Sequence, residues 1–140
     1  MGKFFPILAI VFLAAFFRFW NLTETPPGLY PDEAMNGNNA LEALATRDWK
    51  VFYPENNGRE GLFINIQSLS VALFGNEPWA LRLPSALFGI LTVLGVYFLT
   101  RELFRESEHR STIALLAAFL LATSFWHINF SRIGFRAIMA

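Results

Sequence analysis

The chain has 140 residues, of which 54% are hydrophobic and 16% aromatic, more apolar side chain than one small soluble core can bury. It carries eleven basic and eleven acidic residues and no cysteine. The balanced charge argues against a nucleic-acid partner, and the lack of cysteine excludes a disulfide framework and a thiolate metal site. The composition therefore predicts an integral membrane protein in direct contact with the lipid bilayer.

Three stretches are long and apolar enough to cross a bilayer, which requires about 17 to 25 mostly apolar residues per helix. They cover residues 4–20, 83–100 and 111–131. Arg18 lies near the end of the first stretch, where we expect its side chain to extend to the membrane interface. A cleaved signal peptide is the alternative for this stretch, but no clear cleavage site follows it, so we expect the helix to be retained.

A fourth apolar stretch, residues 61–75, is short and contains several amide and hydroxyl side chains. Arranged as a helix, it has a leucine-rich stripe on one side and Asn65 and Ser68 roughly opposite. This pattern is typical of a helix lying in the plane of the membrane interface, with a short spanning helix as the alternative. Together with a helix from Asp32 to about residue 46, it gives two interfacial helices between the first and second crossings.

The distribution of charge predicts the orientation, because short loops rich in Lys and Arg stay in the cytoplasm. Residues 101–110 contain three arginines, whereas residues 21–81 contain three basic and eight acidic residues. The arginine-rich loop is therefore expected inside and the acidic segment, residues 21–81, outside. The fold class expected is an all-α, multi-pass plasma-membrane protein with three transmembrane helices and two interfacial amphipathic helices in the first external loop.

Two adjacent carboxylates, Asp32 and Glu33, follow a proline in GLYPDEAMNGNNA, residues 28–40. One interpretation is structural: Asp32 caps the following helix, and Glu33 interacts favourably with the helix dipole. Arg59 and Glu60 are likewise interpretable as a solvated ion pair in a loop. From the residues alone, a structural and a functional interpretation of these charges both stay open.

Polar residues also gather at the end of the third apolar stretch. Arg132 and Arg136 are interpretable as basic side chains at the membrane interface, and His127 as an interfacial histidine. The sequence shows no Ser-His-Asp order, no glycine-rich phosphate loop and no metal-ligand spacing. It assigns no metal ligand and leaves a divalent metal requirement open.

Four segments together resemble the integral-membrane glycosyltransferases of the C superfold, which use polyprenyl-phosphate sugars as donors. The segments are YPDEAMNGNNALEALATRDW, GREGLFINIQSLSVALFG, LRLPSALFGILTVLGVYFLTRELF and LLATSFWHINFSRIGFRA. They look most like the branch of the protein O-mannosyltransferases and aminoarabinose transferases, with bacterial relatives of dolichyl-phosphate-mannose type. The resemblance covers nearly the whole chain.

The resemblance implies transfer of a sugar, with inversion, from a polyprenyl-phosphate donor to an acceptor of unknown identity at the external face. Asp32 is then the catalytic base and Glu33 its support, since a positioned carboxylate can take the proton of an attacking hydroxyl. Guanidinium groups suit the donor phosphate because they match two of its oxygens at once. The substrate-binding residues implied are Arg59, Glu60, His127, Arg132 and Arg136.

Two features depart from the family pattern. Many relatives have another acid shortly after the third helix, where this chain reads FRAIMA; either Glu33 or Glu60 replaces it, or it lies further along, or it is dispensable. Members also have many more membrane helices, so we expect residues 1–140 to be the N-terminal part of a truncated membrane domain, inactive in isolation. The alternatives are a non-catalytic membrane scaffold, a transporter subunit and a pseudoenzyme fragment that binds the lipid carrier.

Overall fold

The computed structural model describes residues 5–55 and 57–139, and most of them are helical. The helices are α1 (Phe5–Phe19), α2 (Pro31–Thr46), α3 (Gly61–Phe74), α4 (Pro78–Leu103), α5 (Arg110–Thr123) and α6 (Phe125–Arg132), followed by a short 3-10 helix, η1 (Arg136–Met139). Two strands, β1 (Phe52–Tyr53) and β2 (Arg59–Glu60), pair antiparallel between α2 and α3, where the sequence predicts only a loop. The predicted helical architecture is confirmed.

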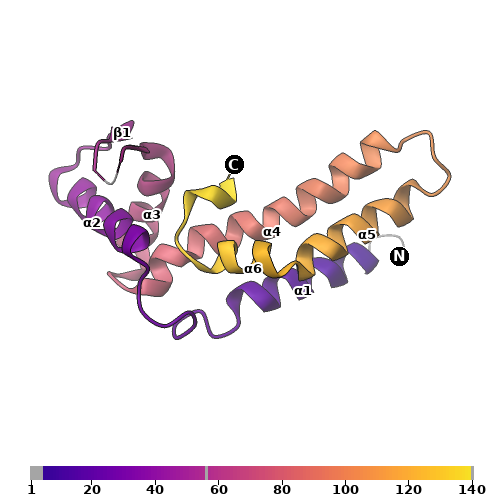
Figure 1. The fold of residues 1–140 in the computed structure, drawn as a ribbon, viewed down its shortest axis with the longest axis horizontal. Coiled ribbons are helices and arrows are strands. Elements are labelled where there is room, and N and C mark those ends of the chain that lie inside the picture. Colours follow the sequence, from indigo (N-terminus) through magenta and orange to yellow (C-terminus); the bar gives the residue numbers. More distant parts are fainter. Residues whose placement is uncertain (1–4, 56, 140) are drawn as a thin grey trace.

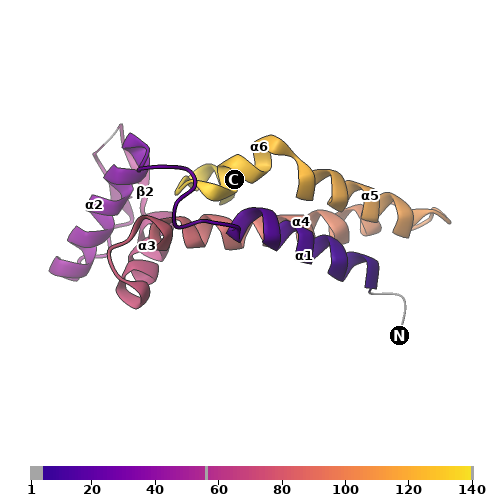
Figure 2. The same ribbon diagram turned by 90° about the horizontal axis from the view of Figure 1, so that it is seen from below.

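The longest helix, α4, runs through the helix bundle and contacts most of the other helices (Figure 1). α1 and α5 lie along its C-terminal part, while α2, α3 and the strand pair gather at its N-terminal end (Figures 1 and 2). α6 and η1 turn back over the middle of α4, toward α2 and α3. The acidic segment and the C-terminal end of the chain are thereby brought together at one end of the helix bundle.

Small side chains let the helices of the bundle approach closely. The core between α1, α4 and α5 contains Ile7, Ala14, Val93, Tyr97, Ala114, Ala118 and Ala122. The three alanines of α5 repeat every four residues and therefore lie on one face of that helix. Between membrane helices, close packing of small residues supplies the attraction that hydrophobicity cannot, because lipid is equally apolar.

The number of membrane crossings stays a prediction. In the described part of the chain, α4, with 26 residues, is the one helix long and apolar enough to cross a membrane alone. α1 has 15 residues, and the third predicted stretch is two helices, α5 and α6, bent by 56° at Ser124. The backbone of Ser124 is extended, with φ −63° and ψ 121°, which ends one helix and begins the next. Counted together, α5 and α6 qualify as one bent span.

Arg18 does not extend to the membrane interface, so that prediction is wrong. Its side chain is fully buried and donates to Ser131 Oγ at 3.2 Å and to the carbonyl oxygens of Ala14 and Ala122 at 3.0 and 3.3 Å. One guanidinium nitrogen also lies 2.6 Å from His127 Nδ1. Because α5 and α6 present acceptors inside the bundle, the side chain is satisfied there without reaching water.

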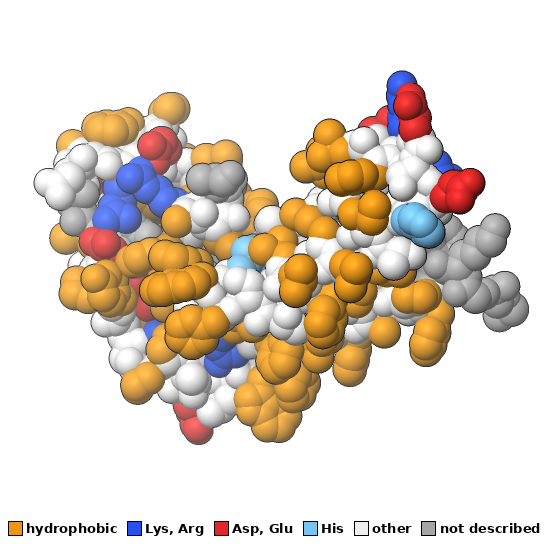
Figure 3. All heavy atoms as spheres, turned by 45° about the vertical axis from the view of Figure 1, so that its right-hand side comes forward, with side chains coloured by type: hydrophobic (Ala, Val, Ile, Leu, Met, Phe, Trp, Pro, Cys, Tyr) orange, Lys and Arg blue, Asp and Glu red, His pale blue; other side chains and the backbone are white. Residues whose placement is uncertain are grey.

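The leucine-rich side of α3 is its exposed side. Leu62, Leu69 and Leu73 are 64%, 54% and 77% exposed, whereas Gln67 and Ser68 are buried and hydrogen-bonded. Figure 3 shows hydrophobic side chains over much of the helix bundle, with most charged side chains near its two ends. An apolar side turned outward fits contact with lipid, while the orientation of α3 in the membrane stays a prediction.

Candidate functional site

The acid pair lies where α2 begins. Pro31 is the first residue of the helix, where its fixed φ angle favours helix and its missing N–H is not needed. Asp32 and Glu33 follow in the first turn, and adjacent helical residues point about 100° apart. Tyr30 occupies the N-cap position, so the interpretation of Asp32 as the cap is wrong. The two neighbouring carboxylates therefore face different surroundings.

Glu33 points into the protein and is fully buried. Its carboxylate accepts hydrogen bonds from Arg82 Nε at 2.8 Å and Nη2 at 3.2 Å, and from the backbone N–H groups of Gly134 at 3.0 Å and Tyr30 at 3.3 Å. Arg82, on α4, is 1% exposed. A buried ion pair is stable only when both ions are fully hydrogen-bonded, and this carboxylate has four donors.

Arg82 also fixes the proline-rich segment before α2. Its Nη1 donates to the carbonyl oxygen of Pro26 at 2.8 Å, and its Nη2 donates to that of Gly28. The same guanidinium thus binds the loop at residues 26–28 and the acid at the start of α2. This arrangement fixes the position from which Asp32 projects.

Asp32 lies on the accessible side of α2. Its Oδ1 is 2.9 Å from Arg59 Nη2 on β2, and the two side chains are 37% and 11% exposed. Arg59 comes from the short strand that the sequence does not predict. The pairing of β1 with β2 places this arginine against the first turn of α2.

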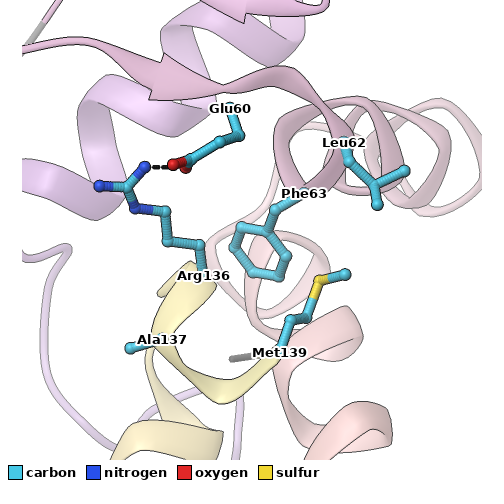
Figure 4. Close-up of a pocket in the computed structure, with 6 residues that line it drawn as sticks. All are labelled: Glu60, Leu62, Phe63, Arg136, Ala137 and Met139. Atoms are coloured by element: carbon cyan, nitrogen blue, oxygen red, sulfur yellow. Dashed lines mark hydrogen bonds and ion pairs between the residues drawn. The ribbon is translucent and has the colours of Figure 1, made fainter.

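Glu60, the next residue of β2, forms a second ion pair with Arg136 of η1 (Figure 4). Both side chains are exposed. A hydrogen bond from its own backbone N–H, followed by the charges of Arg136 and Arg59, holds the pKa of the Glu60 carboxyl below its ordinary value. Arg59 and Glu60, which are adjacent on β2, therefore connect the start of α2 to η1 through two ion pairs, Asp32–Arg59 and Glu60–Arg136.

A cavity of about 440 Å³ opens beside the second ion pair. Its lining comprises Glu60, Leu62, Phe63, Arg136, Ala137 and Met139. Figure 4 shows the ion pair on one side of this space and the apolar side chains of α3 and η1 on the other. Such a cavity suits an amphipathic molecule with a charged group and an apolar chain. Within residues 5–55 and 57–139, no three histidine or carboxylate side chains form a group that could hold a metal ion.

Two of the predicted substrate-binding residues lie elsewhere, against α1. Arg132 is 9% exposed and donates to the carbonyl oxygens of Phe17 at 2.8 Å, Arg18 at 3.3 Å and Thr25 at 2.8 Å. His127 contacts Arg18 through Nδ1. The structure thus groups Asp32 and Glu33 with three of the predicted binding residues, Arg59, Glu60 and Arg136, whereas the side-chain hydrogen bonds of Arg132 and His127 are to α1 and the segment that follows it. The substrate contacts of all seven stay predictions.

Sequence reasoning missed the buried partners beneath the site. Arg82 directly precedes the second apolar stretch, where an arginine is ordinarily an interfacial side chain. Asn36, Gln67 and Gly134 carry no motif that would assign them a role from the sequence. The sequence did contain one signal for such contacts. Polar side chains among so many apolar residues are costly to bury, so those that are buried require hydrogen-bond partners.

A helical bundle with paired carboxylates and arginines at one end is compatible with the membrane glycosyltransferases that the sequence resembles. The family model of the dolichyl-phosphate-mannose-protein mannosyltransferases matches residues 62–136, more than half of the chain. The chain belongs to this family, whose members are membrane proteins that transfer glycosyl groups from a lipid-linked donor. No curated protein and no solved structure matches the chain. The matched region includes Arg82, Gly134 and Arg136, whereas Asp32 and Arg59 precede it.

Proposed function

We propose that this chain carries the general base and part of the donor site of an inverting glycosyltransferase that uses a polyprenyl-phosphate sugar at the external membrane face. The observation that carries the proposal is the position of Asp32. Asp32 is accessible and paired with Arg59. The residue that follows Arg59 on β2 is Glu60, which pairs with Arg136 beside the amphipathic cavity. A base, a cationic surface and an apolar wall are the three features that such a reaction requires.

The chemistry is a single displacement. The acceptor hydroxyl oxygen attacks the anomeric carbon while its proton passes to the Asp32 carboxylate. The bond between the anomeric carbon and the phosphate oxygen breaks, and the polyprenyl phosphate leaves with the electron pair. Because the leaving group is already a stable phosphate anion, no strong general acid is required, in contrast to glycoside hydrolysis.

The two arginines would stabilise the phosphate that leaves. Arg59 and Arg136 now neutralise Asp32 and Glu60, and a donor phosphate between the arginines would compete for the same guanidinium groups. We propose that this competition releases the Asp32 carboxylate to accept the acceptor proton. The apolar side of the cavity, formed by Phe63 and Met139 among others, would take the first isoprene units of the donor.

The test is Asp32→Asn in the intact membrane protein, with polyprenyl-phosphate mannose as donor. The amide cannot accept the proton, so turnover should fall about a hundredfold or more, the usual size of a general-base effect. The free energy of unfolding should change by only about 0.5 kcal/mol, as for other accessible positions. Asp48→Asn, an exposed aspartate of the same acidic segment, is the matched control and should retain turnover. Near-normal turnover by folded Asp32→Asn would refute the assignment.

A further inference from the structure

The backbone N–H and the backbone carbonyl of Gly134 are both hydrogen-bonded to buried side chains of α2 and α3. Its N–H donates to Glu33 Oε1 at 3.0 Å. Its carbonyl oxygen accepts from Asn36 Nδ2 at 3.0 Å and from Gln67 Nε2 at 3.3 Å. The three side chains are 0%, 1% and 0% exposed. One residue of the segment after α6 is thus held by three polar side chains far from it in sequence.

Space, rather than backbone conformation, requires glycine at this position. A Cβ on Gly134 would lie 2.8 Å from Gln67 Nε2 and 3.1 Å from Glu33 Cγ, both closer than ordinary contacts. The φ angle of Gly134 is not positive, in contrast to that of Gly28. The missing side chain therefore allows the Gln67 amide and the Glu33 carboxylate to reach the backbone of Gly134.

The segment held in this way carries parts of the candidate site. Phe135, the next residue, packs edge-on against Tyr30, with ring centroids 5.3 Å apart and planes at 77°. Arg136 follows and pairs with Glu60. Tyr30 in turn precedes Asp32 by two residues, so the contacts of residues 134–136 set the distance between the acid and the arginine.

We propose that Asn36, Gln67 and Gly134 are positioning residues for glycosyl transfer, forming a clamp that holds the Arg136 segment in place beside the start of α2. This inference rests on the proposed function. None of the three lines the cavity beside Arg136, so they act through that residue and not on the substrate. Buried amides among apolar helices cost free energy unless they are hydrogen-bonded. Here Asn36 donates to the Gly134 carbonyl, and Gln67 donates both to that carbonyl and to the carbonyl oxygen of Leu81, at 2.9 Å.

The structural part of the proposal is tested by a distance measurement, which requires no substrate. The chain has no cysteine, so spin labels can be attached at Asn38→Cys on α2 and Ala137→Cys on η1, both exposed. We expect one narrow distance distribution in the parent protein and a broad one in Gly134→Ala. Gly95→Ala, at a glycine with open space around it, is the matched control and should leave the distribution narrow. An unchanged distribution in Gly134→Ala would overturn the clamp.

The functional part uses Gln67→Met in the intact membrane protein, a change that keeps the side-chain length and removes the amide. Loss of a well-placed Arg136 should raise the apparent KM for polyprenyl-phosphate mannose about tenfold, the effect of one charge-assisted hydrogen bond, with little change in kcat. In an Arg136→Ala background, Gln67→Met should have no further effect on KM, since both changes remove the same contact. Leu69→Met, on the exposed side of α3, is the control.

Two outcomes of this experiment overturn the clamp. Equal KM effects of Gln67→Met with and without Arg136 would show that the amide acts independently of the arginine, and global unfolding of Gln67→Met would assign it a role in stability alone. Failure of the proposed function looks different. Either the parent protein would not turn over the donor, or Asp32→Asn would turn it over normally, while the distance measurement would still decide whether the clamp exists.

Discussion

Removing the positive charge of Arg82 should destabilise the protein more than any other single charge removal at the site. Arg82→Met keeps much of the apolar stem but leaves the Glu33 carboxylate buried with only two backbone N–H donors, from Gly134 and Tyr30. Two carbonyl oxygens of the loop before α2 also lose their donor. Breaking one side of a buried ion pair typically costs about 3 to 5 kcal/mol.

A double variant separates the charge from the packing. In Glu33→Gln with Arg82→Met no uncompensated charge is buried, so the double variant should be more stable than the sum of the two single losses predicts. The free energy of unfolding would be measured by denaturant titration in detergent micelles. Arg105→Met, at an arginine 67% exposed, is the control and should change stability by about 0.5 kcal/mol at most. A loss below about 1 kcal/mol in Arg82→Met, or strict additivity in the double variant, would refute the assignment of a stabilising buried pair.

Two other predictions concern the helix bundle and the exposed ion pair. Gly89→Ala places a Cβ in the space of the Ser131 hydroxyl and should lower the free energy of unfolding by about 1 to 3 kcal/mol. Gly95→Ala, in open space, should stabilise α4 by up to about 1 kcal/mol. Equal effects of the two substitutions would contradict the packing of α6 on α4. The lowered pKa of Glu60 means that its contribution to stability is present above its ordinary pKa and is lost as the pH falls through the folded value. Arg136→Gln should raise the pKa of Glu60 only part of the way to its ordinary value, because the backbone hydrogen bond remains; carboxyl NMR titration would measure this, and an unchanged midpoint would exclude the ion pair in solution.

The helical fold could be predicted from the sequence because its determinants are local. Pro31 sets the start of α2, and long apolar runs give α1, α4 and the α5–α6 pair. The family could be recognised for the same reason, since its motifs are short and contiguous. The break at Ser124 left no such signal, because serine is tolerated within helices and its extended backbone here depends on the packing of two helices on α4.

The contacts of the candidate site were less predictable because they depend on rotation and register between distant segments. The pairing of Asp32 with Arg59 requires the two-residue strands, which are too short to show a pattern in the sequence. The inward direction of Glu33 follows from the rotation of α2, which is set by Arg82 49 residues later. Sequence reasoning could therefore propose which charges matter but not which of them would be buried.

The sequence also could not predict the burial of Arg18 and Arg132, the two buried arginines that have no carboxylate partner in the described contacts. Arg18 donates to the carbonyl oxygen of Ala122, in the last turn of α5, and Arg132 donates to those of Phe17 and of Arg18 itself, in the last turn of α1. The last four carbonyl groups of a helix have no partner within it, and in lipid no water replaces that partner. A cation at this end also interacts favourably with the helix dipole. These guanidinium groups therefore make it possible for α1 to end and for α5 to bend inside the bundle, which turns α6 and the Gly134 segment toward the acids of α2.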